Sequence, residues 1–267
     1  MDLINLLETI SVINRDNGKR FTNSERLDVI ASILWDSRYR KINSDGLFNL
    51  YAKHPVDSYQ GNKVVIVSSH VDCQSSITRC FSKQMGNGLL KGTYDNSITN
   101  TAILSLMMSD VIPDNVLIAF TGDEEEESHG AKHLIRFLES KSISIRHLFV
   151  LDVTDMGWDE SVDFTVENNF WQDDYGEKIV NAVCNSSYAW KFVPSYPDRV
   201  PGFVPKKNVI RIEAEPDESW HYDDEGINCC SFCLPTKGEM HSDEGVYARE
   251  SSFRAYTEML NKLLHIS

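Results

Sequence analysis

Short apolar runs alternate along the chain with segments in which apolar residues recur every three or four positions. The apolar runs predict strands at residues 47–52, 63–69, 116–121, 148–153, 209–212 and 231–234. The periodic segments predict helices around residues 27–34, directly after Asn96, and over 131–138, 171–184 and 253–264. Residues 188–205 contain four prolines and predict a long loop.

Nearly continuous apolar strands that alternate with helices are typical of a parallel sheet covered on both faces. The expected fold is therefore three-layer α/β/α with a central mixed, mostly parallel sheet. At 267 residues the chain is near the upper limit for one hydrophobic core, so we expect a single catalytic domain over residues 1–267.

The composition is acidic, with 40 Asp and Glu against 26 Lys and Arg and a formal charge of −14. Such a chain repels phosphate backbones, so a nucleic-acid partner is not expected. The longest apolar runs are too short to span a membrane, and the N-terminus lacks the basic start of a signal peptide. Six scattered cysteines are too few for a disulfide scaffold, which favours a cytoplasmic location.

Polar side chains with metal-binding chemistry follow the predicted strands. His70 and Asp72 end one strand, the acidic run 123–127 ends the next, and Asp152 lies at the end of a third. His241 follows the last strand, and Asp95 precedes a helix. In a parallel sheet these segments meet at one edge. Mixed imidazole and carboxylate ligands suit zinc, with cobalt or manganese as alternatives.

The ordered set of these segments resembles the co-catalytic dizinc exopeptidase superfamily, which includes zinc aminopeptidases and peptidase T-like and carboxypeptidase G-like enzymes. The matching segments are His70-Val71-Asp72, Asp95-Asn96, Asp123-Glu124-Glu125 with Gly130-Ala131, Asp152 and Met240-His241-Ser242. The resemblance spans roughly residues 47 to 265 and implies the zinc-dependent exopeptidase fold and two zinc ions as cofactors.

Residue by residue, the resemblance implies that Asp95 bridges the two ions. It also implies that His70 and Asp152 complete one metal site and that Glu125 and His241 complete the other. Glu124 would be the general base toward the attacking water, and Asp72 would hold the ring of His70. The family also places a cis peptide bond after the bridging aspartate, here between Asp95 and Asn96.

Two points stay open at this stage. Four consecutive glutamates compete for two roles, and their register against Ser128-x-Gly130-Ala131 favours Glu124 and Glu125. Some relatives place an oxyanion-stabilising tyrosine where this chain has Met240, so Tyr222 and Tyr247 become candidates for that role.

The intervals of 82 residues from His70 to Asp152 and of 89 residues on to His241 leave no room for an inserted lid domain.

The expected function is a dizinc aminopeptidase acting on peptides. The alternatives are an amidohydrolase or deacylase acting on N-acyl amino acids or small amides, and a non-catalytic metal-binding relative. Calcium binding by the acidic run alone is disfavoured because calcium prefers oxygen ligands over histidine. The oligomeric state is left open by the sequence.

Overall fold

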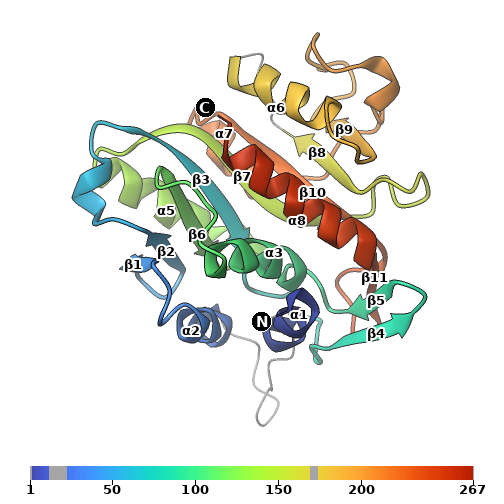
Figure 1. Cartoon of the computed structure of the whole chain (residues 1–267), viewed down its shortest axis with the longest axis horizontal. Coiled ribbons are helices and arrows are strands. Elements are labelled where there is room, and N and C mark those ends of the chain that lie inside the picture. Colours follow the sequence, from blue (N-terminus) through green and yellow to red (C-terminus); the bar gives the residue numbers. More distant parts are fainter. Residues whose placement is uncertain (1, 12–22, 169–173, 267) are drawn as a thin grey trace.

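The computed structural model describes residues 2–11, 23–168 and 174–266, and its elements are labelled in Figure 1. The helices are α1 (Leu3–Ser11), α2 (Asn23–Ile33), α3 (Ser97–Met108), α4 (Glu124–Glu127), α5 (His129–Ser140), α6 (Asp174–Cys184), α7 (Glu218–Asp224) and α8 (Glu250–Leu264), with short 3₁₀ turns at Val56–Tyr59 and Lys206–Asn208. Of these helices, none is long and apolar enough to cross a membrane, within the described part of the chain.

The strands form one mixed sheet. They are β1 (Arg40–Ser44), β2 (Phe48–Ala52), β3 (Lys63–His70), β4 (Ser82–Gly86), β5 (Leu89–Gly92), β6 (Val116–Thr121), β7 (Ser144–Thr154), β8 (Phe164–Asn168), β9 (Trp190–Pro194), β10 (Cys229–Glu239) and β11 (Gly245–Arg249). The central strands β6, β3, β7 and β10 are mutually parallel, whereas β1 and β2 on one side and β11, β5 and β4 on the other pair antiparallel.

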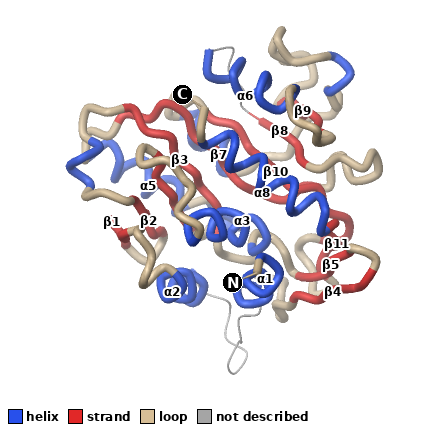
Figure 2. Tube along the Cα trace, viewed as in Figure 1, coloured by secondary structure: helices blue, strands red, loops and turns tan. Residues whose placement is uncertain are grey.

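Both faces of the central sheet are buried because its strands present apolar side chains to each side in alternation. On β3, Val65 and Val67 join the larger core, which includes the apolar faces of α1, α3 and α8. Val64 and Ile66 point the other way, into a second core with α5 and Tyr222 of α7. Figure 2 shows α3 and α8 lying across one face of the strands. The expected three-layer α/β/α fold is confirmed.

The segment between β7 and β10 differs from the sequence-based expectation. The predicted loop 188–205 contains strand β9, which pairs in parallel with β8. Strand β8 in turn joins the sheet through antiparallel pairing with β10. The predicted strand 209–212 is wrong: Val209 makes only an isolated bridge to Phe192, and Ile212 is 56% exposed. The predicted helix 171–184 is present as α6 from Asp174 onward, and its first residues lie outside the described part of the chain.

A close approach of three backbone segments connects the start of α5 with the end of β6. The amide of Gly122 donates to the carbonyl oxygen of Leu47 at 2.8 Å, and the amide of Gly130 donates to the carbonyl oxygen of Gly122 at 2.9 Å. A Cβ on Gly130 would lie 2.5 Å from the Gly122 nitrogen and 2.7 Å from the Leu47 oxygen. Only glycine fits at this crossing, which fixes where the acidic turn before α5 leaves the sheet.

We therefore expect Gly130→Ala to destabilise the protein by about 1–3 kcal/mol, because the methyl group meets backbone atoms that cannot rotate away. Chemical denaturation followed by circular dichroism measures this change. Gly202→Ala is the matched control, since a Cβ there meets nothing within 4 Å and the backbone φ is ordinary. Equal stability of the two variants would contradict the close approach.

Candidate metal centre and active site

The parallel strands carry two of the predicted ligands to one edge of the sheet. His70 is the last residue of β3 and lies in register with Thr121 at the end of β6. Asp152 lies near the end of β7, in register with Cys233 of β10. The sequence-based expectation of convergence at the carboxyl ends of the strands is met for these residues.

The turn that bears Asp95 is fixed by hydrogen bonds from the start of α3 to the two neighbouring strands. The side-chain amide of Asn96 donates to the carbonyl oxygen of Leu151 at 2.6 Å, and that of Asn100 donates to the carbonyl oxygen of His70 at 2.8 Å. The peptide bond between Asp95 and Asn96 is cis, as the resemblance implies. Asp95 is 6% exposed, so these hydrogen bonds fix the backbone next to a buried carboxylate.

The acidic run forms a single helical turn, α4, between two residues with left-handed backbone, Asp123 (φ 58°) and Ser128 (φ 50°). Glu124 and Glu125 line the cavity, whereas the following two glutamates are exposed. The two oxygens of Asp72 accept the amides of Glu124 and Glu125, each at 3.1 Å. Asp72 therefore contacts the backbone of the first two glutamates as well as the ring of His70.

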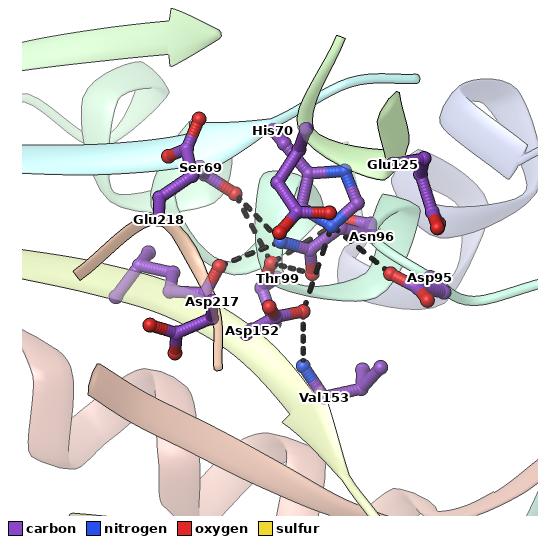
Figure 3. Close-up of polar contacts among 12 residues, drawn as sticks. Ser69, His70, Asp95, Asn96, Thr99, Glu125, Asp152, Val153, Asp217 and Glu218 are labelled. Atoms are coloured by element: carbon purple, nitrogen blue, oxygen red, sulfur yellow. Dashed lines mark hydrogen bonds and ion pairs between the residues drawn. The ribbon is translucent and has the colours of Figure 1, made fainter. Parts of the chain in front are cut away.

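Two histidines face opposite oxygens of the same carboxylate. Nε2 of His70 lies 3.0 Å from Oδ1 of Asp95, and Nε2 of His241 lies 3.3 Å from Oδ2. Asp152 Oδ1 lies 3.6 Å from Nε2 of His70, and Glu125 Oε2 lies 3.4 Å from Nε2 of His241. Figure 3 shows His70, Asp95, Glu125 and Asp152 turned toward one another. The structure thus brings together all five residues predicted as metal ligands.

Burial is the main cause of the raised pKa values of the carboxyl groups in the site. Burial raises the pKa of Glu124 to about 10 and that of Glu125 to about 8, with neighbouring carboxylates adding to the effect. Burial also raises the pKa of Asp152 to about 6. The contact between His241 and Asp95 raises the pKa of His241 to about 9, because the carboxylate favours the imidazolium. A cation placed between these side chains would favour the ionised form of each carboxyl group.

The donor set fits a transition-metal centre. Oε1 of Glu125 is buried without a hydrogen-bond partner, which is costly for a carboxylate unless a cation contacts it. Donor atoms of His70, Asp95 and Glu125 lie within 4.8 Å of one another. Imidazole nitrogens and carboxylate oxygens are ligands that zinc accepts. Nδ1 of His70 lies 3.4 Å from Oδ1 of Asp72, the arrangement in which a carboxylate orients a metal-binding ring.

The side chains surround a cavity of about 360 Å³. This volume lies within the range of about 300–1,000 Å³ that is typical of small-ligand pockets. All five predicted ligands and Glu124 line it, whereas neither tyrosine candidate does. Tyr222 is fully buried, and its hydroxyl lies 2.9 Å from Ser68 Oγ, which removes it from the oxyanion role. Tyr247 lies on β11, and the ammonium group of Lys91 lies over its ring, 4.9 Å from the ring centroid.

Further acidic residues of the site were not predicted from the sequence. Glu167 of β8 and Asp217, the N-cap of α7, both line the cavity. Glu218 is fully buried beneath it and accepts a hydrogen bond from Ser68 Oγ at 2.8 Å. The sequence offers one weak signal, because Pro216-Asp217-Glu218-Ser219 is a helix start that presents two carboxylates.

Asp72→Asn tests how α4 is anchored. Whichever way the new amide is turned, one acceptor oxygen is lost and an N–H donor of Glu124 or Glu125 faces another donor. We expect a loss of about 1–3 kcal/mol in the free energy of unfolding of the metal-free protein, because a buried donor loses its partner. Urea denaturation measures it, with Glu127→Gln as a control at an exposed position of the same turn. No change beyond the control would refute this anchoring role.

Comparisons with known proteins agree with this fold. The TET1 peptidase of Pyrococcus horikoshii has a similar fold, with a TM-score of 0.67, 10% identity, and coverage of 98% of this chain and 99% of that chain. The aminopeptidase APDkam598 of the archaeon Desulfurococcus kamchatkensis gives a TM-score of 0.67 at 10% identity, covering 99% of this chain and 95% of that one.

A zinc aminopeptidase of Bacillus subtilis gives a TM-score of 0.54 at 13% identity, and the match covers 82% of this chain and 48% of the Bacillus subtilis chain. At these identities the likeness establishes the fold. A search among curated proteins finds no matching relative. The model of peptidase family M28 matches residues 49–227, and the chain therefore belongs to peptidase family M28.

Proposed function

We propose that the protein is a zinc-dependent aminopeptidase with a dinuclear metal site. The observation that carries this proposal is the carboxylate of Asp95, whose two oxygens face two different histidines inside a cavity that Glu124 also lines. Membership of peptidase family M28 and the folds of the similar aminopeptidases support the same activity.

His70 and Asp152 would hold one zinc ion, Glu125 and His241 the other, and Asp95 would contact both. When bound, the metals supply Lewis-acid polarisation of the scissile carbonyl and lower the pKa of the attacking water. Asp72 keeps Nδ1 of His70 in place and fixes the first turn of α4. Cobalt or manganese would suit the same donors.

Glu124 is the general base in this proposal. Its carboxylate lines the cavity next to the ligand Glu125, so it can accept the proton of the attacking water and pass it to the leaving amine. Without metal, burial raises its pKa to about 10, so the carboxyl would keep its proton at neutral pH. The cations held by the neighbouring ligands would favour its ionised form before it accepts that proton.

The charge of the cavity favours a free α-amino group in the substrate. Among the described residues, no Lys or Arg lines the cavity, and its two histidines are proposed metal ligands, so a terminal carboxylate would meet mainly acidic side chains there. A carboxypeptidase, or a deacylase acting on N-acyl amino acids, needs a cationic group for that carboxylate. The cavity therefore favours an aminopeptidase over both, and the intact donor set speaks against a non-catalytic relative.

We also propose that the chain acts as one catalytic domain without an inserted lid. The segment between Asp152 and His241 adds β8 to the edge of β10 and β9 to β8, and its helix α7 packs against α5. These contacts make the segment part of the same sheet and core.

Metal content tests the metal centre. Purified protein reconstituted with zinc should hold about two ions per chain, as dinuclear hydrolases do. Asp95→Ala should lose most of this metal because both sites share that carboxylate. Elemental mass spectrometry measures the ratio, with Glu126→Ala as the control on the exposed side of α4. Binding of no metal by the wild type would exclude the proposed chemistry.

Substrate cleavage tests the reaction. The zinc-loaded protein should release the first residue of a peptide with a free N-terminus and should leave its N-acetylated counterpart intact, as followed by liquid chromatography and mass spectrometry. Glu124→Gln should retain the metal and lose activity by about 100-fold or more, the effect expected for a general base. Preferential cleavage of the acetylated peptide would favour the amidohydrolase alternative instead. Near-wild-type rates in Glu124→Gln would show that another group acts as the base.

A further inference from the structure

The cavity extends beyond the candidate metal ligands to a wall formed by β8 and the start of α7. This wall carries the carboxylates of Glu167 and Asp217. The apolar residues Met156 and Met240 line the space as well. Two acidic groups beside an apolar surface suit a ligand that has an aliphatic stem and a cationic end.

Glu167 is placed by strand pairing. It pairs with Ser231 of β10, and two residues earlier Thr165 pairs with Cys233, which in turn pairs with Asp152 of β7. Since residues two apart on a strand share a face, Glu167 lies on the same face of the sheet as Asp152. Two strand spacings, roughly 10 Å, separate β8 from β7. This distance corresponds to an extended side chain of the substrate, whereas the α-amino group lies next to the scissile bond.

The carboxylate of Glu167 has no cationic partner of its own. It is 4% exposed, and its polar contacts are the neutral hydroxyls of Thr165 and Thr154. Among the described residues, none of the Lys, Arg or His side chains pairs with it. Burial raises its pKa to about 8, the direction expected when no neighbouring charge compensates a buried carboxylate.

Asp217 reinforces the negative character of this wall. Its Oδ1 accepts the amide of Ser219 at 2.8 Å, and its Oδ2 accepts the side-chain amide of Asn168 at 2.9 Å and the hydroxyl of Ser231. All three donors are neutral, so they fix the orientation of the carboxylate and leave its charge uncompensated. A cation that enters the cavity would meet both acids.

We propose that Glu167, supported by Asp217, is a specificity-determining residue that binds the cationic side chain of a terminal Lys or Arg residue. The inference rests on the proposed function and adds the substrate class. The apolar residues contact the methylene stem, and the ammonium or guanidinium group replaces the missing counter-charge of Glu167. Acidic terminal residues are repelled from the same wall.

The test compares fluorogenic amides of lysine, norleucine and leucine on the zinc-loaded full chain. Norleucine has the same four-carbon stem as lysine and lacks only the ammonium group. We expect the wild type to show a kcat/KM for lysine at least about tenfold above that for norleucine, as for a site that pairs a buried polar group of its substrate. Glu167→Gln should bring the ratio close to one by lowering the lysine value. Glu139→Gln, an exposed position on α5, should leave the ratio unchanged.

A binding measurement separates this inference from the proposed function. Isothermal titration calorimetry should show free lysine binding at least about tenfold more tightly than free norleucine, with the difference lost in Glu167→Gln. If no amide is cleaved but lysine-selective binding persists, the peptidase proposal fails and the cation site stands. A wild type that does not prefer lysine in either measurement overturns the inference. Equal losses for all three substrates in Glu167→Gln also overturn it, since they would indicate a general structural role. Should Glu167→Gln fold poorly, the wild-type preference alone decides.

Discussion

The burial of neighbouring carboxylates at one edge of the sheet, with their mutual repulsion added, is the constraint on which the candidate site depends. Asp95, Glu124, Glu125 and Asp152 line one cavity, and the pKa values of the last three lie above those of free carboxylic acids. Left alone, such a group would take up protons or move apart. Divalent cations remove the conflict, since they favour the ionised form of every carboxylate at once. The side chains are therefore arranged for bound metal.

The backbone supplies the rigidity that holds these charges together. His70 and Asp152 lie on adjacent parallel strands in the centre of the sheet, where both faces are buried. Side-chain amides of α3 bind the carbonyl oxygens of both strands, and Asp72 receives the first amides of α4. Because the backbone around His70, Asp95 and Asp152 is fixed in this way, cation binding by the proposed ligands would require little reorganisation there, which would favour both affinity and catalysis.

The central strands and their terminal ligands could be predicted because each strand is short, apolar and buried on both faces, so the polar residue that ends it is conspicuous. The outer strands were not found, since β1 and β4 expose most of their side chains and lack an apolar run. The apolar pattern at 209–212 was misleading, because its residues bridge β9 at one position only. Glu167 could not be predicted either. Its place in the cavity follows from the pairing of β8 with β10, a long-range contact that no local pattern encodes.

The two parts of the cavity differ in how their negative charge is compensated. At the strand ends, imidazoles and carboxylates together form a donor set for metal ions, so cations resident in the protein can neutralise that part. At the wall of β8 and α7 the donors around Glu167 and Asp217 are hydroxyls and amides, which orient a carboxylate without neutralising it. In the proposed binding mode, the cationic group of the ligand supplies the compensation there. A substrate with an aliphatic cation would thus be bound by the same electrostatic requirement that selects the metals, and a neutral substrate would leave a buried acid unpaired.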